Sequence, residues 1–146
     1  MTGDESIKKL FLEYEKAFSA LDIAKNAEFF AEVFISAGPR GAIAQSKAEF
    51  LKLAHQAAEF YRRVGQTSAR ILSLQETPIS GEYSMVKVHW GVTFKKTGDK
   101  LIAFDVSYFV QKTGPEPRII MFIAHEDEQK AMEELGLLFG QPMNIE

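Results

Sequence analysis

Two side chains in this sequence could carry acid–base chemistry, provided that the fold brings them together. Tyr14 lies in an N-terminal segment whose apolar residues recur at helical spacing, and Asp105 lies in the middle of an alternating segment, 104–108. A carboxyl group in an apolar enclosure can serve as a general acid or base, and a tyrosine hydroxyl can donate a hydrogen bond to an oxygen that gains charge. Asp105 and Tyr14 are therefore the candidate catalytic residues.

Further candidates follow from the alternation of side chains along the predicted strands. Successive strand residues point to opposite faces, so Val92 and Phe94 share a face with Trp90. If that face lines a pocket, we expect the strand pairing to place Asp105 and Ser107 on it as well. A register shift of one residue would exchange the two faces.

The last strand and the first helix complete the candidate site. The same alternation points Phe122 and Glu126 inward, and helical spacing adds Phe18. A wall of aromatic and aliphatic side chains with a few polar groups is typical of a small-molecule site. The expected ligand-binding residues are Trp90, Val92, Phe94, Ser107, Phe122, Glu126 and Phe18.

Structural alternatives accompany these functional interpretations. Asp105 could be a buried carboxylate bonded to Tyr14 or to a backbone amide. Tyr14 could be a core residue with a bonded hydroxyl, and Trp90 could supply burial alone. The deciding feature is whether Asp105 and Tyr14 share one open cavity.

Metal and nucleophile chemistry find no support in the sequence. The histidines His55, His89 and His125 are too far apart for a local metal motif, and His125 and Glu126 are strand neighbours that point to opposite faces. The chain has no cysteine and no Gly-x-Ser-x-Gly segment, so nothing indicates a thiol or serine nucleophile. We expect no metal and no cofactor.

The composition is that of one globular domain spanning residues 1–146. Hydrophobic residues make up 46% and charged residues 25% of the 146, which is ordinary for a chain that buries a core without disulfides. The net charge of −3 argues against nucleic acid as a partner, since such a partner needs a basic face. No signal peptide or membrane-spanning run is visible, so we expect a cytoplasmic protein without membrane contact.

Helical patterns occupy the first part of the chain. Apolar residues recur at helical spacing over 7–21, and Asp22 can cap a second helix. That helix is expected to carry Phe29, Phe30 and Val33 toward the core.

A turn and a third helix lead into the strands. The turn 38–41 separates two short extended segments. Ser46 and Glu49 form a capping box for a helix that stops at Gly65, a residue suited to a left-handed C-cap. Strands are expected over 67–76, 83–96, 100–112 and 118–126, and a last helix over 128–138.

Three segments resemble patterns of one known superfamily. Tyr14-x-x-Ala17-Phe18-x-x-x-Asp22 resembles the first helix of ketosteroid isomerases, 29–32 resembles the Leu-Phe-Ala-Asp run that follows it, and 104–108 resembles the penultimate strand of SnoaL-like proteins. Ketosteroid isomerases and SnoaL-like proteins are both members of the NTF2-like superfamily, which this chain therefore resembles. The resemblance implies a cystatin-like α+β cone, with N-terminal helices packed on a curved, mixed, mostly antiparallel sheet and a short C-terminal helix. The alternative, a START-like helix-grip fold, begins with a strand and ends with a long helix.

The resemblance also implies a catalytic site, of which this chain keeps one position in three. The isomerases hold an oxyanion with a tyrosine of the first helix, matched by Tyr14, and with a protonated acid on the sheet, matched by Ser107. The proton-shuttling acid falls near Gly38. We therefore expect no ketosteroid isomerase activity.

Three interpretations of function remain. The first is a pocket protein that binds an apolar or aromatic small molecule through few polar anchors. The second is an isomerase-, cyclase- or dehydratase-type enzyme with Asp105 as acid/base and Tyr14 as donor. The third is a homodimeric association module joined through an apolar stripe on the outside of the sheet. Strand alternation predicts that stripe from Phe104, Val106, Tyr108, Met121 and Ile123.

Overall fold

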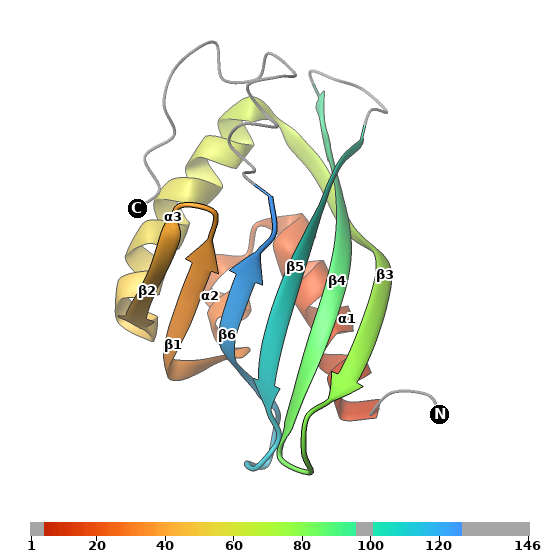
Figure 1. Cartoon of the computed structure of the whole chain (residues 1–146). Helices are drawn as coiled ribbons and strands as arrows, with labels where there is room; N and C mark the ends of the chain where they lie inside the picture. The colour runs from red at the N-terminus through yellow and green to blue at the C-terminus, as the bar shows by residue number, and fades with distance from the viewer. Residues whose placement is uncertain (1–4, 96–100, 127–146) are drawn as a thin grey trace.

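The computed structural model describes residues 5–95 and 101–126 (Figure 1). The helices are α1 (Glu5–Ala20), α2 (Ile23–Ala27) and α3 (Lys47–Val64). The strands are β1 (Phe30–Gly38), β2 (Gly41–Ser46), β3 (Gln66–Pro78), β4 (Tyr83–Phe94), β5 (Leu101–Gln111) and β6 (Arg118–Ala124). The predicted strands are present with bounds that differ by a few residues. The expected helix at 128–138 lies outside the described residues.

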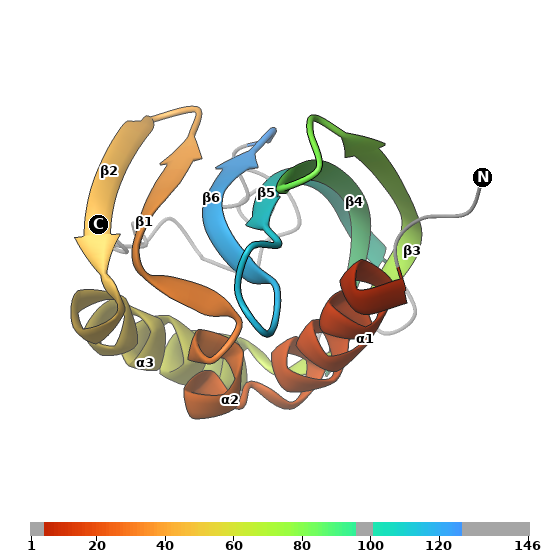
Figure 2. The same cartoon turned by 90° about the horizontal axis from the view of Figure 1, so that it is seen from below.

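The strands form one curved, mixed sheet in the order β2-β1-β6-β5-β4-β3. Strands β1 and β6 run parallel, and the other neighbours run antiparallel. All three helices lie on the same side of this sheet (Figure 2). We call the side toward the helices the inner face and the opposite side the outer face. The arrangement confirms the predicted α+β architecture of N-terminal helices on a mixed sheet.

Both predicted ends of α3 are confirmed. The Ser46 hydroxyl accepts a hydrogen bond from the Glu49 backbone N–H at 3.2 Å, and the Glu49 carboxylate accepts one from the Ser46 backbone N–H at 2.8 Å. Gly65 ends the helix with φ of 86°, a left-handed conformation that costs glycine little. Local sequence signals therefore position α3 beside the sheet.

The second helix is shorter than predicted. Asp22 caps α2 by accepting a hydrogen bond from the Lys25 backbone N–H at 3.2 Å, as expected. The helix ends at Ala27, however, and Phe30 begins β1. Phe30 is buried as predicted, but Val33 is 64% exposed, because it lies on a strand that alternates between the two faces.

The core lies between α1 and the inner face of β4 and β5. Trp90 is fully buried and donates its indole N–H to the Tyr108 hydroxyl at 3.1 Å. The ring of Phe18 packs edge-on against the Trp90 ring, with 5.0 Å between centroids. These contacts make Trp90 the centre of the packed core.

The pairing of β5 with β4 contradicts the predicted faces. Trp90 pairs with Phe104, and His89 pairs with Asp105. Directly paired residues share a face, so Phe104 lies on the inner face and Asp105 on the outer face. The assignment of Asp105 and Ser107 to the inner wall was wrong. Odd- and even-numbered positions of this strand both carry apolar side chains, so alternation alone did not determine which of them point inward.

The predicted outer stripe is corrected for the same reason. Phe104, Val106 and Tyr108 are only 7%, 6% and 3% exposed and belong to the core. Met121 and Ile123 do lie on the outer face, where Met121 pairs with Phe109 on β5 and with Ile35 on β1.

Candidate functional site

A cavity of about 270 Å³ lies between the three helices and the inner face of the sheet. It is bounded by α1, α2, α3 and the strands β1, β2 and β6, and its lining is mainly aromatic and aliphatic. The lining residues are Tyr14, Phe18, Leu21, Ile23, Asn26, Ser36, Gln45, Phe50, Leu53, Ala54, Ala57, Ala58, Tyr61 and Phe122.

Helix α3 forms one wall of the cavity, with large side chains near its ends and small ones between them. Phe50 and Tyr61 contribute aromatic rings near its two ends, and Ala54, Ala57 and Ala58 lie between them. These positions recur at helical spacing and therefore share a face. Because a methyl group fills little space, the three alanines leave the room that larger side chains would take.

Helix α1 supplies the opposite aromatic wall. Tyr14 and Phe18 are one turn apart and both line the cavity. The Tyr14 ring packs against Trp90 and Tyr108 with centroid distances of 5.9 and 5.6 Å. This packing ties the cavity wall to the core and holds the ring in place.

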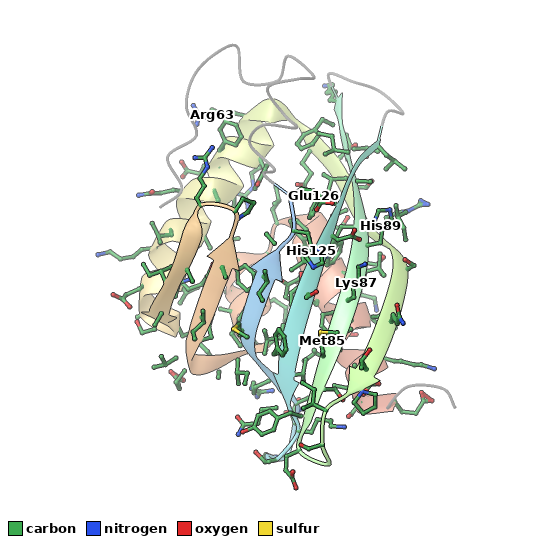
Figure 3. All side chains as sticks on the ribbon, viewed as in Figure 1. Arg63, Met85, Lys87, His89, His125 and Glu126 are labelled. Carbon is green, nitrogen blue, oxygen red and sulfur yellow. The ribbon has the colours of Figure 1, made fainter. Side chains whose placement is uncertain are left out.

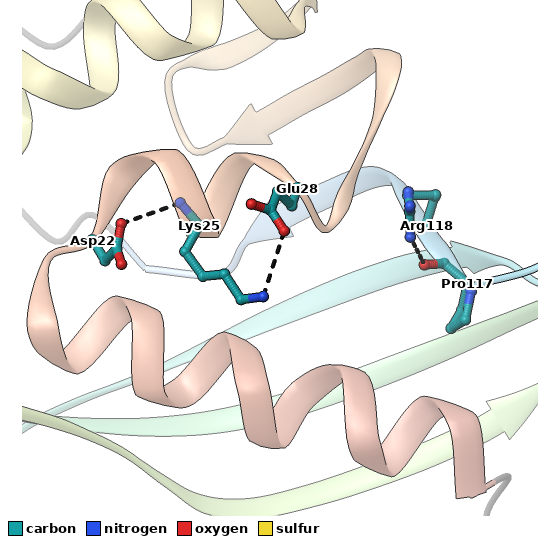
Figure 4. A network of polar contacts seen from close by, with 5 residues as sticks. All are labelled: Asp22, Lys25, Glu28, Pro117 and Arg118. Carbon is teal, nitrogen blue, oxygen red and sulfur yellow. Dashed lines mark hydrogen bonds and ion pairs between the residues drawn. The ribbon is translucent and has the colours of Figure 1, made fainter.

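Short-range polar contacts position α2, the third helical wall. Asp22 caps the helix, and the Lys25 ammonium lies 3.4 Å from the Glu28 carboxylate (Figure 4). The Ile119 backbone N–H at the start of β6 donates to the Phe29 carbonyl at 2.8 Å. The link that follows α2 is thus fastened to the sheet, close to the cavity-lining residue Asn26.

Two amide side chains in the cavity lining carry oxygens without a partner. Asn26 is 8% exposed and Gln45 is 7% exposed. The Asn26 Oδ1 and Gln45 Oε1 atoms are buried, and neither accepts a hydrogen bond from any of the residues that the structure describes. Leaving a buried acceptor unpaired costs roughly 1–3 kcal/mol, so these two oxygens are unfavourable features of the cavity lining as it stands.

The chemistry of the described lining is neutral. Its ionisable side chains are the phenols of Tyr14 and Tyr61, and none of the described lining residues is an acid, a histidine, a lysine or an arginine. A tyrosine titrates near pH 10 in water. This arrangement can bind and orient an uncharged molecule, and its described part supplies no general base for neutral pH.

Residues 4–127 match the family described as NTF2-like protein (DUF6841). The chain belongs to this family of NTF2-like proteins. No protein with a curated function matches the sequence.

Several solved structures share the fold of this chain at low sequence identity. A protein of unknown function from Shewanella oneidensis MR-1 has a TM-score of 0.70 at 14% identity, covering 84% of this chain and 98% of its own. A ketosteroid isomerase-like protein from Erwinia carotovora atroseptica SCRI1043 has a TM-score of 0.61 at 17% identity, covering 82% of this chain and 92% of its own. A putative scytalone dehydratase from Novosphingobium aromaticivorans DSM 12444 has a TM-score of 0.66 at 13% identity, covering 82% of this chain and 80% of its own. These identities establish a common fold and nothing finer.

Three predicted site residues line the cavity of this NTF2-like chain: Tyr14, Phe18 and Phe122. Trp90, Val92 and Phe94 lie on the inner face as predicted, but they are 0%, 3% and 2% exposed and belong to the core cluster. They pack in the core and are not among the residues that line the cavity.

The polar candidates Asp105 and Ser107 lie on the outer face. Asp105 Oδ1 is 2.8 Å from His89 Nδ1, and Ser107 Oγ is 2.7 Å from His125 Nε2. The Glu126 carboxylate accepts a hydrogen bond from the Asp105 backbone N–H at 2.8 Å. We call these five residues the outer-face cluster; Figure 3 labels three of them, His89, His125 and Glu126. The expectation that Asp105 and Tyr14 share one cavity was therefore wrong.

The sequence interpretation missed the two amides and the α3 wall. Gln45 pairs with Phe34, an inner-face residue of β1, so strand alternation around the turn 38–41 could have placed it inside. The run of alanines between Phe50 and Tyr61 was a second available signal. Asn26 gave no comparable signal, since polar residues are common in short helices at the surface.

The described residues hold neither a metal-binding cluster nor a membrane-spanning helix. Within residues 5–95 and 101–126, no three histidine, cysteine, aspartate or glutamate side chains are grouped so that they could hold a metal ion. None of the helices described here is long and apolar enough to cross a bilayer.

Proposed function

We propose that this NTF2-like protein binds a small, mainly apolar molecule in the cavity between its helices and the inner face. The observation that carries the proposal is the cavity itself: about 270 Å³, which is the liquid volume of roughly nine water molecules. Aromatic rings from α1, α3 and β6 line it. Such an enclosure with a few polar groups is the usual form of a small-molecule site.

Binding without turnover accounts for the described lining better than acid–base catalysis does. The names of two structural relatives refer to a ketosteroid isomerase and a scytalone dehydratase. Chemistry of either kind needs a group that moves a proton near neutral pH. Asp105, the acid that we had expected to do so, lies on the outer face beside His89. We therefore still expect no ketosteroid isomerisation.

A cavity-filling substitution tests the proposal. Ala57 lines the cavity, whereas Gln56, its neighbour on α3, is exposed. We expect Ala57→Leu to weaken the binding of 2-naphthol, followed by calorimetry, at least about tenfold, because the added carbons occupy the ligand's volume. Gln56→Leu adds a similar side chain outside the cavity and should leave the affinity unchanged. Equal affinities for the two variants would refute binding in this cavity.

We also propose that the outer face joins two copies of the chain. Ile35 and Ile123 are 40% and 36% exposed there, next to the partly buried Phe109 and Met121. Large exposed apolar side chains gathered on one face favour association. Lys87 lies on the same face as the carboxylates of the outer-face cluster (Figure 3). A two-fold axis can set the cation of each copy against the carboxylates of the other.

A further inference from the structure

Asn26 and Gln45 approach the cavity from different elements, α2 and β2, and both leave an oxygen unpaired. Neither side chain has a structural task among the described residues. In α2, the Asp22 side chain caps the N-terminus, and the backbone carbonyl of Asn26 accepts the Phe29 N–H at 3.3 Å. In β2, Ser46 rather than Gln45 caps the next helix. Two amides are thus held in the lining without being used by the fold.

The geometry points to a neutral ligand with hydrogen-bond donors, such as an aromatic alcohol, as the class of molecule that this cavity selects. This inference rests on the proposed function of the same cavity. Each amide oxygen accepts hydrogen bonds and can be satisfied only by an O–H or N–H group. A donor on the ligand would remove the cost of the buried, unpaired oxygen, which an ether or a hydrocarbon cannot do.

Both amides can turn toward a bound molecule. The terminal amide torsions of asparagine and glutamine are broad and roughly two-fold. A small rotation about this torsion re-aims the amide oxygen at little cost. Asn26 and Gln45 can therefore present an oxygen to a donor without any movement of α2 or β2.

The charge of the lining argues for a neutral ligand over an ionised one. No described lining residue carries a positive or negative charge at neutral pH. A carboxylate or ammonium group brought into an apolar enclosure loses its hydration and, with no opposite charge to pair with, pays several kcal/mol in general. The cavity should therefore discriminate against acids and amines of the same shape.

Three probes with one ring system test the inference: 2-naphthol, its methyl ether 2-methoxynaphthalene, and the anion 2-naphthoate. Affinities are measured by calorimetry at pH 7, and the site is mapped by amide chemical shifts. We expect 2-naphthol to bind about threefold to tenfold tighter than the ether, the net worth of one hydrogen bond to a buried acceptor. The naphthoate should bind most weakly.

The outcomes separate this inference from the proposed function. If the ether and the naphthol shift cavity resonances with equal affinity, donor selection is wrong and the binding function stands. If the naphthoate binds most tightly in the cavity, neutrality is wrong. If none of the three probes shifts a cavity resonance, both the inference and the proposed function fail.

Amide-to-apolar variants give an independent readout. Gln45→Met and Asn26→Leu keep the side-chain size but remove the acceptor, so the preference for 2-naphthol over its ether should shrink. Because an unpaired oxygen is lost, the melting temperature of the apo protein should stay the same or rise. Leu53→Met, a lining change without a polar group, is the matched control and should keep the preference. A melting temperature lowered by several degrees in Gln45→Met with an unchanged preference would overturn the inference.

Discussion

Asp105 is held by its neighbours on the outer face of the sheet. Its carboxylate contacts His89, and its backbone N–H contacts the Glu126 carboxylate. Its side chain is also 25% exposed, so part of its hydration is kept. These contacts explain why a carboxylate is tolerated in the middle of β5 without any ligand.

A substitution at Asp105 distinguishes this structural role from a role in binding. We expect Asp105→Asn to leave the affinity of the cavity for 2-naphthol unchanged and to lower the unfolding free energy by no more than about 1 kcal/mol, since a partly exposed side-chain hydrogen bond contributes little. Calorimetric titration and urea unfolding measure the two effects. A large loss of affinity at unchanged stability would mean that the outer face communicates with the cavity.

At the scale of elements, the capping box of α3 makes a clear contribution to stability. Ser46→Ala removes the oxygen that accepts from the Glu49 N–H and should lower the unfolding free energy by about 1 kcal/mol, measured by urea unfolding. The cavity-lining residue Gln45 directly precedes Ser46. Measuring the affinity of Ser46→Ala for 2-naphthol therefore tests whether fraying of α3 also weakens ligand binding.

The capping box also predicts a pH dependence. Hydrogen bonds from the Ser46 backbone N–H, and then from its side chain, hold the pKa of Glu49 below its usual value. A carboxyl group with a lowered folded-state pKa contributes stability above its unfolded pKa, which is about 4.3, and loses it as the pH falls through the folded value. The stability difference between the wild type and Glu49→Gln should therefore shrink in acid. A difference that grows below pH 4 would contradict this account.

The register of β5 gives a second prediction at this scale. Val106 is 6% exposed and pairs with the fully buried Val88. Val106→Glu would bury an unpaired carboxylate, which costs several kcal/mol, so we expect the protein to lose cooperative unfolding. Ala103→Glu on the exposed outer face of the same strand is the control and should fold normally, as followed by circular dichroism. A well-folded Val106→Glu protein would instead favour the opposite register, in which Val106 lies on the outer face.

The elements were predictable from the sequence, and the strand register was not. The caps at Ser46 and Gly65 rest on contacts within a few residues, which local patterns encode. The face of β5 rests on its pairing with β4, and β5 carries apolar side chains such as Val106 and Phe109 at both parities. Asn26 and Gln45 line one cavity only when α2 and β2 are packed around it, so no sequence spacing reveals that the two amides share a site.

At the scale of the whole molecule, the outer face predicts self-association. Ile123→Glu would place a charge in the apolar part of this face and should dissociate a dimer into monomers, as followed by sedimentation equilibrium at micromolar concentration. Ile79→Glu is the matched control, since Ile79 is 59% exposed in the link between β3 and β4. A wild-type chain that sediments as a monomer would refute the proposed dimer.

The position of a bound molecule tests the central claim most directly. Titration of the isotope-labelled protein with 2-naphthol, followed by amide chemical shifts, maps where the ligand sits. We predict saturable shifts at cavity residues such as Ala54, Ala57 and Gln45, and none in the outer-face cluster. Shifts confined to His89, Asp105 and their neighbours, with the α3 resonances unmoved, would contradict the assignment of this cavity as the binding site.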